Sequence, residues 1–318
     1  MKLAILDDYQ NAALKSAAWD SLGPDVEITV FNEHLGWDED AIAARLAPFD
    51  ILVIMRERTP FPASLLAKLP NLKLLVTTGM RNLAVDMDAA RARGVVVCGT
   101  AILPFPAAEL AMAFIMDLAK KLSAENRIMH EGGWQGVVGE ALNGKTLGIL
   151  GLGRLGSRVA RFGKALEMDV IAWSQNLTQE RCEAEGVRLV SKEDLFRQSD
   201  FLSIHVLLSE RTRGLIGREE LAMMKPTAYL VNTSRGPIVD EQALIDALRS
   251  GAIAGAGLDV YDVEPLPKDH PLRSLDNAIL TGHIGYVIRE HYEMLYGECV
   301  EDVAAFLKGA PVRVLNEG

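Results

Sequence analysis

The sequence predicts an α/β protein with two doubly wound parallel-sheet domains. Three observations point to this fold class. The chain has 318 residues, about twice the length of a common domain. Short runs rich in Val, Ile and Leu alternate with helix-like segments. These runs are apolar at nearly every position, which is typical of strands buried on both faces of a helix-covered parallel sheet.

Five such runs precede residue 100 and predict the strands of the first domain. They span residues 3–6, 26–31, 51–55, 72–77 and 95–98. The stretches between them suit crossover helices, with the clearest examples at 40–46, 62–69 and 85–93. The last of these precedes Gly94, a residue type that commonly ends helices.

Six further runs predict the strands of the second domain, at 147–150, 170–173, 201–205, 228–231, 255–258 and 278–280. They alternate with helix-like segments at intervals of roughly 20 to 30 residues, which favours a doubly wound nucleotide-binding sheet. We therefore expect two separate α/β sheets in one chain.

Two predicted helices connect these sheets. Residues 106–129 have no internal Gly or Pro and predict one helix of about 35 Å, ended by Gly132 and Gly133. Residues 291–307 predict another helix, after which the apolar tail 312–315 is expected to return to the first sheet. The predicted domains are therefore 1–100 with 287–318, and 101–286.

The composition limits the partners of the protein. A net charge of -10 argues against binding to nucleic acid or to an anionic membrane. Cys98, Cys182 and Cys299 lie far apart and form no CxxC pair, so we expect neither a metal site nor a disulfide framework. Asp7 and Asp8 interrupt the apolar start of the chain, and no run approaches the ~18 apolar residues of a membrane span. We expect a cytoplasmic protein.

A glycine-rich turn follows the predicted strand at 147–150. Gly151, Gly153 and Gly156 form the pattern G-x-G-x-x-G between that strand and a helix. In a dinucleotide-binding unit these glycines allow a tight turn, backbone approach to a pyrophosphate and close helix packing, respectively. The free amides of the helix start would hold the phosphates, at Arg154 and Leu155. A glycine-rich turn without a ligand is the alternative.

The end of the next strand bears on the choice of dinucleotide. A carboxylate is expected there to bind the adenosine ribose, but the chain has Ser174, Gln175 and Asn176. A 2′-phosphate would meet no like charge and could be held by Ser174 or Thr178, which favours NADP slightly over NAD. The nearest arginine downstream is Arg181, so NAD stays open.

Three later strands are followed by residues that suit carbonyl reduction, which needs a proton donor and a cation that polarises the carbonyl. Arg235 emerges at the carboxyl edge of the sheet, where such sheets bind ligands. His283 can donate the proton, and Glu264 can stabilise the imidazolium. Arg235 can hold the substrate carboxylate and stay charged. A lone histidine near a strand is often structural, and we interpret His205 in that way.

These residues stand in motifs that resemble those of the D-2-hydroxyacid dehydrogenase family. N-x-x-R-G spans 232–236, G-x-D-V-x-x-x-E-P spans 257–265 and H-I-G spans 283–285. The resemblance covers almost the whole chain. It implies a Rossmann nucleotide-binding domain, a flavodoxin-like substrate domain, a 2-oxoacid bound in the cleft between them, and a homodimer formed through the 106–129 helix.

The resemblance also implies residue roles. Arg235 binds the substrate, Glu264 is the partner of the histidine and His283 is the acid/base. The implied cofactor contacts are Asp259, which meets the nicotinamide amide, and Thr233, His283 and Gly285. Two positions depart from the family pattern, because Gly282 replaces a usual Pro and Ser174 replaces the Asp of many NAD-using members. The first departure bears on loop rigidity and the second on the cofactor.

In the first domain a glycine turn follows the strand at 72–77. Backbone amides at Thr78 and Gly79 could bind the substrate carboxylate as an anion nest. An ordinary strand-to-helix turn is the alternative. Arg56 follows the strand at 51–55 and is a further candidate for substrate binding, with a solvated loop as its alternative.

The activity expected from the resemblance is NAD(P)-dependent reduction of a small 2-oxoacid, of the glyoxylate or hydroxypyruvate type, to a D-2-hydroxyacid. D-3-phosphoglycerate dehydrogenase is the alternative within the same enzyme class. A nicotinamide-sensing, corepressor-like binding protein is the alternative from another class. Sensing alone does not require an acid/base, so the trio of Arg235, Glu264 and His283 favours an enzyme.

Overall fold

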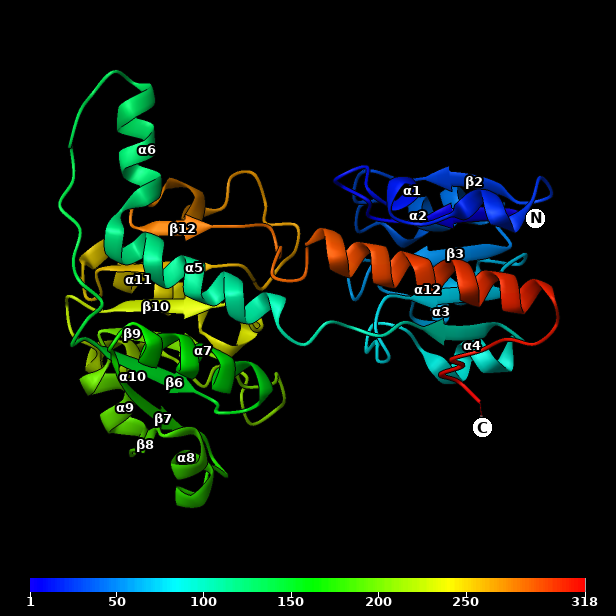
Figure 1. The fold of residues 1–318 in the computed structure, drawn as a ribbon. Coiled ribbons are helices and arrows are strands. Elements are labelled where there is room, and N and C mark those ends of the chain that lie inside the picture. The colour runs from blue at the N-terminus through cyan, green and yellow to red at the C-terminus, as the bar shows by residue number, and fades with distance from the viewer. Residues whose placement is uncertain (318) are drawn as a thin grey trace. The chain divides into compact units, whose positions relative to one another are not determined.

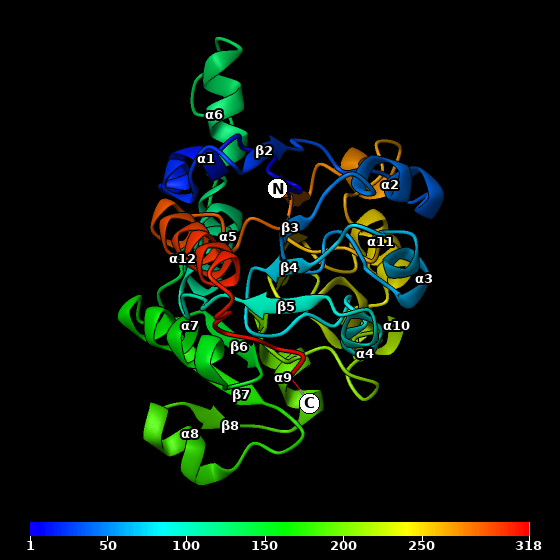
Figure 2. The same cartoon turned by 90° about the vertical axis from the view of Figure 1, so that its right-hand side faces the viewer.

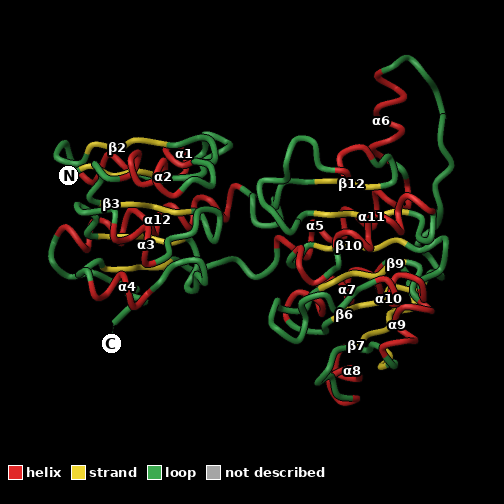
Figure 3. Tube along the Cα trace, turned by 180° about the vertical axis from the view of Figure 1, so that it is seen from behind, coloured by secondary structure: helices red, strands yellow, loops and turns green. Residues whose placement is uncertain are grey.

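The computed structural model describes residues 1–317, and the chain divides into two compact units. Unit 1 comprises residues 1–103 together with the chain from residue 287 onward, and unit 2 comprises residues 104–286. Figure 1 shows a helix-covered sheet in each unit, and Figure 3 shows the strands of both sheets in yellow. All strand pairs are parallel, so the predicted class of two parallel-sheet α/β domains is confirmed.

Unit 1 has a five-stranded sheet in the order β2-β1-β3-β4-β5, which is the flavodoxin-like order. Its strands agree closely with the predicted apolar runs, and the residues of β3 and β4 are all buried. The elements of unit 1 are β1 (Lys2–Ile5), α1 (Ala13–Ser16), η1 (Trp19–Leu22), β2 (Glu27–Val30), α2 (Glu39–Leu46), β3 (Ile51–Ile54), α3 (Ala63–Ala67), β4 (Leu74–Thr77), α4 (Met87–Ala92), β5 (Val96–Gly99) and α12 (Arg289–Leu307).

The last helix and the tail complete unit 1. Helix α12 lies against β4, β5 and α1, and Figure 2 shows it in red beside the sheet. In the tail, Leu315 N–H donates to Val97 O at 2.7 Å, and Asn316 Oδ1 accepts from Val97 N–H at 3.0 Å. The tail therefore lies along the β5 edge through one backbone and one side-chain hydrogen bond to Val97.

Unit 2 has a seven-stranded sheet in the order β12-β11-β10-β9-β6-β7-β8. The chain adds strands on one side of β6 and then on the other, as in a Rossmann sheet. Its elements are α5 (Pro106–Lys120), α6 (Leu122–His130), β6 (Thr146–Leu150), α7 (Arg154–Ala165), β7 (Asp169–Trp173), α8 (Gln179–Glu185), β8 (Arg188–Leu189), α9 (Lys192–Gln198), β9 (Phe201–Ile204), α10 (Arg218–Met223), β10 (Tyr229–Asn232), η2 (Gly236–Ile238), α11 (Glu241–Ser250), β11 (Gly255–Leu258), η3 (Pro271–Ser274) and β12 (Ala278–Leu280).

The prediction of one helix over 106–129 is wrong, because α5 ends at Lys120 and α6 begins at Leu122. Lys121 between them has a φ of 59°, a left-handed conformation that interrupts the helix without Gly or Pro. Its Nζ donates to Tyr229 Oη at 2.9 Å and lies over the same ring. A tertiary contact therefore fixes the break. Helix α5 is buried on the sheet of unit 2, whereas α6 has no buried residue.

Among the described residues, no helix is both long and apolar enough to span a membrane.

Candidate active site

The first part of the site is the turn between β6 and α7. Gly151 has a φ of 101°, and its N–H donates to Trp173 O at 2.9 Å. A Cβ at Gly156 would lie 2.0 Å from Gly151 O, so only glycine lets α7 begin this close to β6. A Cβ at Gly153 would meet no atom within 4 Å. The turn is therefore closely packed on one side and accessible on the other, which fits a pyrophosphate lying against it.

Arg154 and Leu155 form the first turn of α7. The first N–H groups of a helix have no partner within the helix and carry a partial positive charge. The residue before α7 is Gly153, which provides no side-chain cap for them. These amides are therefore positioned to bind an anion such as a pyrophosphate.

The adenosine end of such a ligand would lie near the end of β7. Ser174 follows this strand, and its carbonyl accepts from Leu177 N–H at 3.0 Å. Arg181 from α8 reaches across to α7, where its guanidinium lies 3.2 Å from Ser157 Oγ and 3.3 Å from Glu185. The structure thus brings a cation, which follows the end of β7 by eight residues, beside the first turns of α7.

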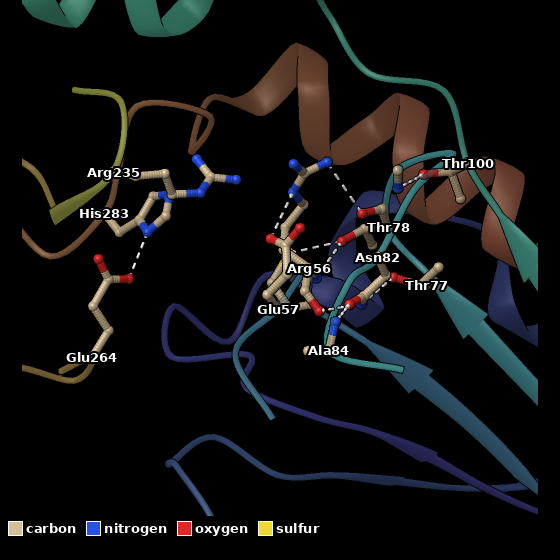
Figure 4. A network of polar contacts seen from close by, with 12 residues as sticks. Arg56, Glu57, Thr77, Thr78, Asn82, Ala84, Thr100, Arg235, Glu264 and His283 are labelled. Atoms are coloured by element: carbon tan, nitrogen blue, oxygen red, sulfur yellow. Dashed lines mark hydrogen bonds and ion pairs between the residues drawn. The ribbon is translucent and has the colours of Figure 1, made fainter. Parts of the chain in front are cut away.

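Arg235, Glu264 and His283 follow β10, β11 and β12, which are neighbours in the sheet. The carboxyl ends of neighbouring parallel strands meet at one edge, so these side chains arise from the same edge. Figure 4 shows the His283 ring with Nδ1 turned toward Glu264. The distance from His283 Nδ1 to Glu264 Oε2 is 2.6 Å, and the two side chains are 21% and 22% exposed.

Glu264 is held by the loop that carries it. Its Oε1 accepts from Tyr261 N–H at 3.0 Å, which leaves Oε2 directed at the histidine. The Tyr261 phenol is itself buried, with Leu258 O at 3.0 Å and Thr281 O at 2.9 Å as acceptors. Burial raises the pKa of Tyr261, so the phenol stays a donor at ordinary pH. The carboxylate is therefore oriented before any ligand binds.

His283 has a φ of 54°, a conformation that is uncommon for a residue other than glycine. Strain of this kind persists only where the surroundings impose it, and it concentrates at functional sites. Here Asp259 imposes it. Its carboxylate accepts from Thr281 Oγ1 at 2.6 Å, from Ile284 N–H at 2.7 Å and from Gly285 N–H at 2.8 Å.

These bonds bear on two expectations, the rigidity of the loop at Gly282 and the contact of Asp259 with the nicotinamide amide. Asp259 holds residues on both sides of Gly282, so the loop is fixed without the proline usual in the family. A carboxylate has about four acceptor positions, and three are used within the protein. Burial raises the pKa of Asp259, with these donors acting in the opposite direction. One acceptor position is left for the nicotinamide amide, and that contact stays a prediction.

The arginine is supported by the segment after β10. Asn232 Nδ2 donates to Arg235 O at 3.0 Å, and Asn232 Oδ1 accepts from Ser234 N–H at 3.0 Å. Arg235 Nη1 donates to Ser234 O at 2.8 Å. Thr233 is buried within this turn. The chain around Arg235 is thus tied to the strand end by a buried asparagine.

Unit 1 brings together its own candidate residues at the ends of β3 and β4, also drawn in Figure 4. Arg56 has a φ of 52°, its N–H donates to Thr78 Oγ1 at 2.9 Å, and its Nη1 lies 3.5 Å from Thr78 O. Its Nε lies 3.9 Å from Glu57. Asn82 Nδ2 donates to Arg56 O at 2.7 Å. Arg56 and Thr78 therefore form one hydrogen-bonded group.

The anion nest expected at Thr78 and Gly79 does not form from these two amides. Thr78 N–H donates to Ile54 O at 3.1 Å, and Gly79 N–H donates to Thr100 Oγ1 at 3.0 Å. Both donors are used inside the unit, which favours the ordinary turn that the sequence left as the alternative. Binding of substrate by Thr78 and Gly79 would have to use other atoms.

Outside these groups, His205 lies 2.8 Å from Ser203 Oγ, and burial lowers the pKa of His205 to about 4. The ring is therefore neutral at ordinary pH, in line with a structural role. Among the described residues there is no cluster of His, Cys, Asp and Glu able to hold a metal ion.

The sequence did not single out Tyr261, Asn232 or Thr281, which orient Glu264, Arg235 and the His283 loop. The signal was their position inside or beside the motifs, because Asn232 is the first residue of N-x-x-R-G and Tyr261 lies three residues before Glu264.

Comparisons with known proteins agree with this geometry. Residues 112–285 match the family model described as D-isomer specific 2-hydroxyacid dehydrogenase, NAD binding domain. The D-3-phosphoglycerate dehydrogenase of Archaeoglobus fulgidus is 35% identical over 98% of this chain, which spans 58% of that protein's length. The hydroxypyruvate reductase of Blautia hydrogenotrophica is 32% identical, with 100% of both chains covered. The crystal structure of phosphoglycerate oxidoreductase from Vibrio cholerae has a TM-score of 0.91 at 36% identity and covers 98% of this chain and 100% of that chain.

Proposed function

The chain belongs to the D-isomer specific 2-hydroxyacid dehydrogenase family, and we propose that it interconverts a small 2-oxoacid and the D-2-hydroxyacid with a nicotinamide dinucleotide. Glyoxylate and hydroxypyruvate are the proposed substrate types, and a relative of full coverage is named hydroxypyruvate reductase. The observation that carries this proposal is the 2.6 Å contact of His283 with Glu264 at the sheet edge that also bears Arg235.

The residues divide the work as follows. A bound nicotinamide supplies the hydride that the carbonyl carbon receives. Nδ1 of His283 faces Glu264, so Nε2 on the other side of the ring passes a proton to the carbonyl oxygen. Glu264 balances the charge of the imidazolium. Arg235 binds the substrate carboxylate and polarises the carbonyl, which holds the 2-oxoacid in a reactive orientation.

The backbone of the glycine turn suits the pyrophosphate of a dinucleotide. The pyrophosphate would lie at Gly153 and the amides of Arg154 and Leu155, where no Cβ obstructs the backbone. Asp259 retains one acceptor position for an amide N–H of the nicotinamide. We also assign Thr233 and Gly285 to the cofactor site. Arg56 and Thr78 are proposed to contribute to substrate binding, and Gly79 to support it by leaving room for the Arg56 guanidinium, since a Cβ there would lie 2.3 Å from Arg56 Nη1.

We propose NADP as the preferred dinucleotide. No carboxylate follows β7 at positions 174–176, and Arg181 places a guanidinium beside the first turns of α7. The test compares fluorescence titrations with NADPH and NADH, and adds 2′,5′-ADP as a fragment that needs no turnover. Tighter binding of NADPH, lost when Arg181 is replaced by Gln, is the expected result. NADH binding equally or more tightly would reject the preference.

The decisive experiment for the function is a steady-state panel of glyoxylate, hydroxypyruvate and 3-phosphohydroxypyruvate with each reduced cofactor. Turnover of glyoxylate or hydroxypyruvate, abolished in His283→Ala, is expected. A clear preference for the phosphorylated substrate would instead support D-3-phosphoglycerate dehydrogenase, the name carried by several relatives, including that of Archaeoglobus fulgidus. Cofactor binding without any turnover would support the corepressor-like alternative.

We further propose a cytoplasmic homodimer. Helix α6 has no buried side chain, and Figures 1 and 3 show it projecting from the rest of unit 2. Leu122, Met129 and Trp134 on α6 and the following loop are exposed apolar side chains. Such a patch is typical of an interface. Light scattering of the wild type and of Met129→Glu tests this, since a dimer that the substitution dissociates is expected and a wild-type monomer would reject it.

A further inference from the structure

A second histidine–carboxylate pair contacts the loop that carries Glu264. His270 Nε2 is 3.0 Å from Glu241 Oε1, and the two side chains are 16% and 21% exposed. Glu241 is the first residue of α11, and His270 precedes η3. Neither residue belongs to the motifs of the active site. The pair is part of the wall of a cavity of about 490 Å³ that Arg213, Asp240 and Asp262 also line.

The carboxylate of Glu241 uses its second oxygen on the catalytic loop. Glu241 Oε2 accepts from Asp262 N–H at 3.3 Å. The preceding amide, Tyr261 N–H, donates to Glu264 Oε1 at 3.0 Å. Two consecutive amides of this loop are therefore each bound by a carboxylate, one from α11 and one from the residue that pairs with His283. The two N–H groups belong to adjacent peptide units that share the Cα of Tyr261, so a displacement of that Cα changes both bonds.

The 261–262 peptide also touches the segment of Arg235. A Cβ at Gly236 would lie 2.1 Å from Tyr261 C and 2.6 Å from Asp262 N, so the two backbones are in direct contact. A shift of this peptide toward Gly236 is blocked sterically. Glu241 opposes a shift in the other direction, because its hydrogen bond would lengthen. The peptide is thus held between Gly236 and Glu241.

His270 fixes the orientation of Glu241. Its Nδ1 accepts from Leu272 N–H at 3.3 Å, so the proton of a neutral ring lies on Nε2 and is donated to Glu241. Leu272 is buried, which anchors the histidine. Other charged groups near the pair are Asp240, which caps α11, and Arg213 and Asp262. Burial and the charges of Glu241 and Asp240 raise the pKa of Asp262.

We propose that Glu241 and His270 are positioning residues for the reaction, which hold the 261–262 peptide so that Glu264 meets His283 Nδ1. Only the kinetic test of this inference rests on the proposed function. A purely structural role would change stability alone, whereas a positioning role changes the protonation behaviour of the active-site histidine.

The first test is Glu241→Gln. The Glu241 carboxylate accepts from two donors, His270 Nε2–H and Asp262 N–H. Glutamine has only one acceptor oxygen, so its NH2 group faces one of these donors. The expected result is a fall in kcat of about 10-fold, since small displacements of reacting groups cost factors of this order. The KM of the 2-oxoacid changes much less. The pH at which reduction falls to half its plateau moves downward, in the direction expected for Glu264→Gln.

Glu220 provides a matched control. It accepts from one backbone donor, Gly217 N–H at 2.9 Å, and from one side-chain donor, Lys192 Nζ at 2.6 Å, and it is 15% exposed. Glu220→Gln therefore perturbs a similar carboxylate in the same unit, and it should leave the pH profile unchanged. Equal effects of Glu241→Gln and Glu220→Gln on kcat and on the profile would overturn the proposal.

Substitutions of His270 test the positioning role if Glu241→Gln does not fold. His270→Gln keeps a donor toward Glu241 and should retain most activity, whereas His270→Ala should reproduce the loss and the pH shift. Wild-type activity in His270→Ala would overturn the proposal.

A readout without turnover separates this inference from the proposed function. The Nδ1–H proton of a histidine bound to a carboxylate gives a downfield NMR signal, which can be followed for His283 in the wild type and in Glu241→Gln. Its loss supports positioning even if no 2-oxoacid is reduced. An unchanged signal overturns the proposal, whatever the enzyme assay shows.

Discussion

Replacing Glu264 with Gln removes one charge while nearly keeping the shape of the side chain. Glu264 Oε1 accepts from Tyr261 N–H at 3.0 Å, and Oε2 lies 2.6 Å from His283 Nδ1. Glutamine can keep the first bond with its carbonyl oxygen, which turns its NH2 group toward Nδ1. Two donors then face each other whenever the ring is protonated. The substitution therefore disfavours the imidazolium that donates the proton in reduction.

The size of the effect follows from the contact that is lost. A hydrogen bond to a charged group contributes about 1.5–3 kcal/mol net. Both side chains are about one-fifth exposed, so water screens the pair and the lower part of that range applies. A loss of about 1.5–2 kcal/mol corresponds to a roughly 10- to 30-fold slower reduction at neutral pH. Oxidation uses the neutral ring as a base, so it should fall less at alkaline pH.

The assay is kcat/KM for reduction of the best 2-oxoacid, measured between about pH 5 and pH 9. In Glu264→Gln the half-activity point should move to lower pH. Asp276→Asn is the control, because it removes the same charge from an exposed position in the same connection between β11 and β12. Superimposable profiles for the wild type and Glu264→Gln would refute the reasoning. So would an equal shift in Asp276→Asn, since it would assign the effect to the overall charge of this part of the unit and not to the contact.

Three other predictions follow from single contacts. Arg235→Lys replaces a planar fork with a point charge, so the KM of the 2-oxoacid should rise by about 10-fold or more in steady-state kinetics; an unchanged KM would exclude Arg235 from carboxylate binding. Gly156→Ala puts a methyl group 2.0 Å from Gly151 O, so dinucleotide affinity measured by fluorescence titration should fall sharply, and retained affinity would contradict the role of the turn. Burial raises the pKa of Asp302 to about 7 despite its bond to Arg313. Its protonated form is thus favoured in the folded state, and stability is lost as pH rises from about 4 through 7. Thermal melts of Asp302→Asn should show a smaller decline over this range than the wild type, and identical slopes would contradict the assignment.

The sequence was sufficient to predict the strands in which nearly every consecutive residue is apolar. Strands such as β3 and β4 are apolar at nearly every position because both faces of the sheet are covered. Strand β8 was missed because it has only two residues, Arg188 and Leu189, at the edge of the sheet. An edge strand exposes one side, so it carries no continuous apolar run.

Features set by tertiary contacts were not predictable in the same way. The break between α5 and α6 depends on Lys121 bonding to Tyr229, 108 positions away in the chain. The Glu241–His270 pair spans 29 positions, and neither residue stands in a strand-end motif. Propensity describes local preference only, and such contacts override it. The same reasoning explains Gly79, whose amide is used by Thr100 and not offered to a ligand.

The three groups at the sheet edge of unit 2 share one structural principle. Each is held by a hydrogen bond between a side chain and the backbone of a loop: Asn232 Nδ2 donates to Arg235 O, Glu264 Oε1 accepts from Tyr261 N–H, and Asp259 accepts from Gly285 N–H of the His283 loop. Loops are the most mobile parts of a fold, yet proton transfer requires fixed geometry. Because the strands provide only the starting points, these bonds supply the remaining order. Variants that weaken them should therefore lower kcat more than they raise KM, which distinguishes lost orientation from lost binding.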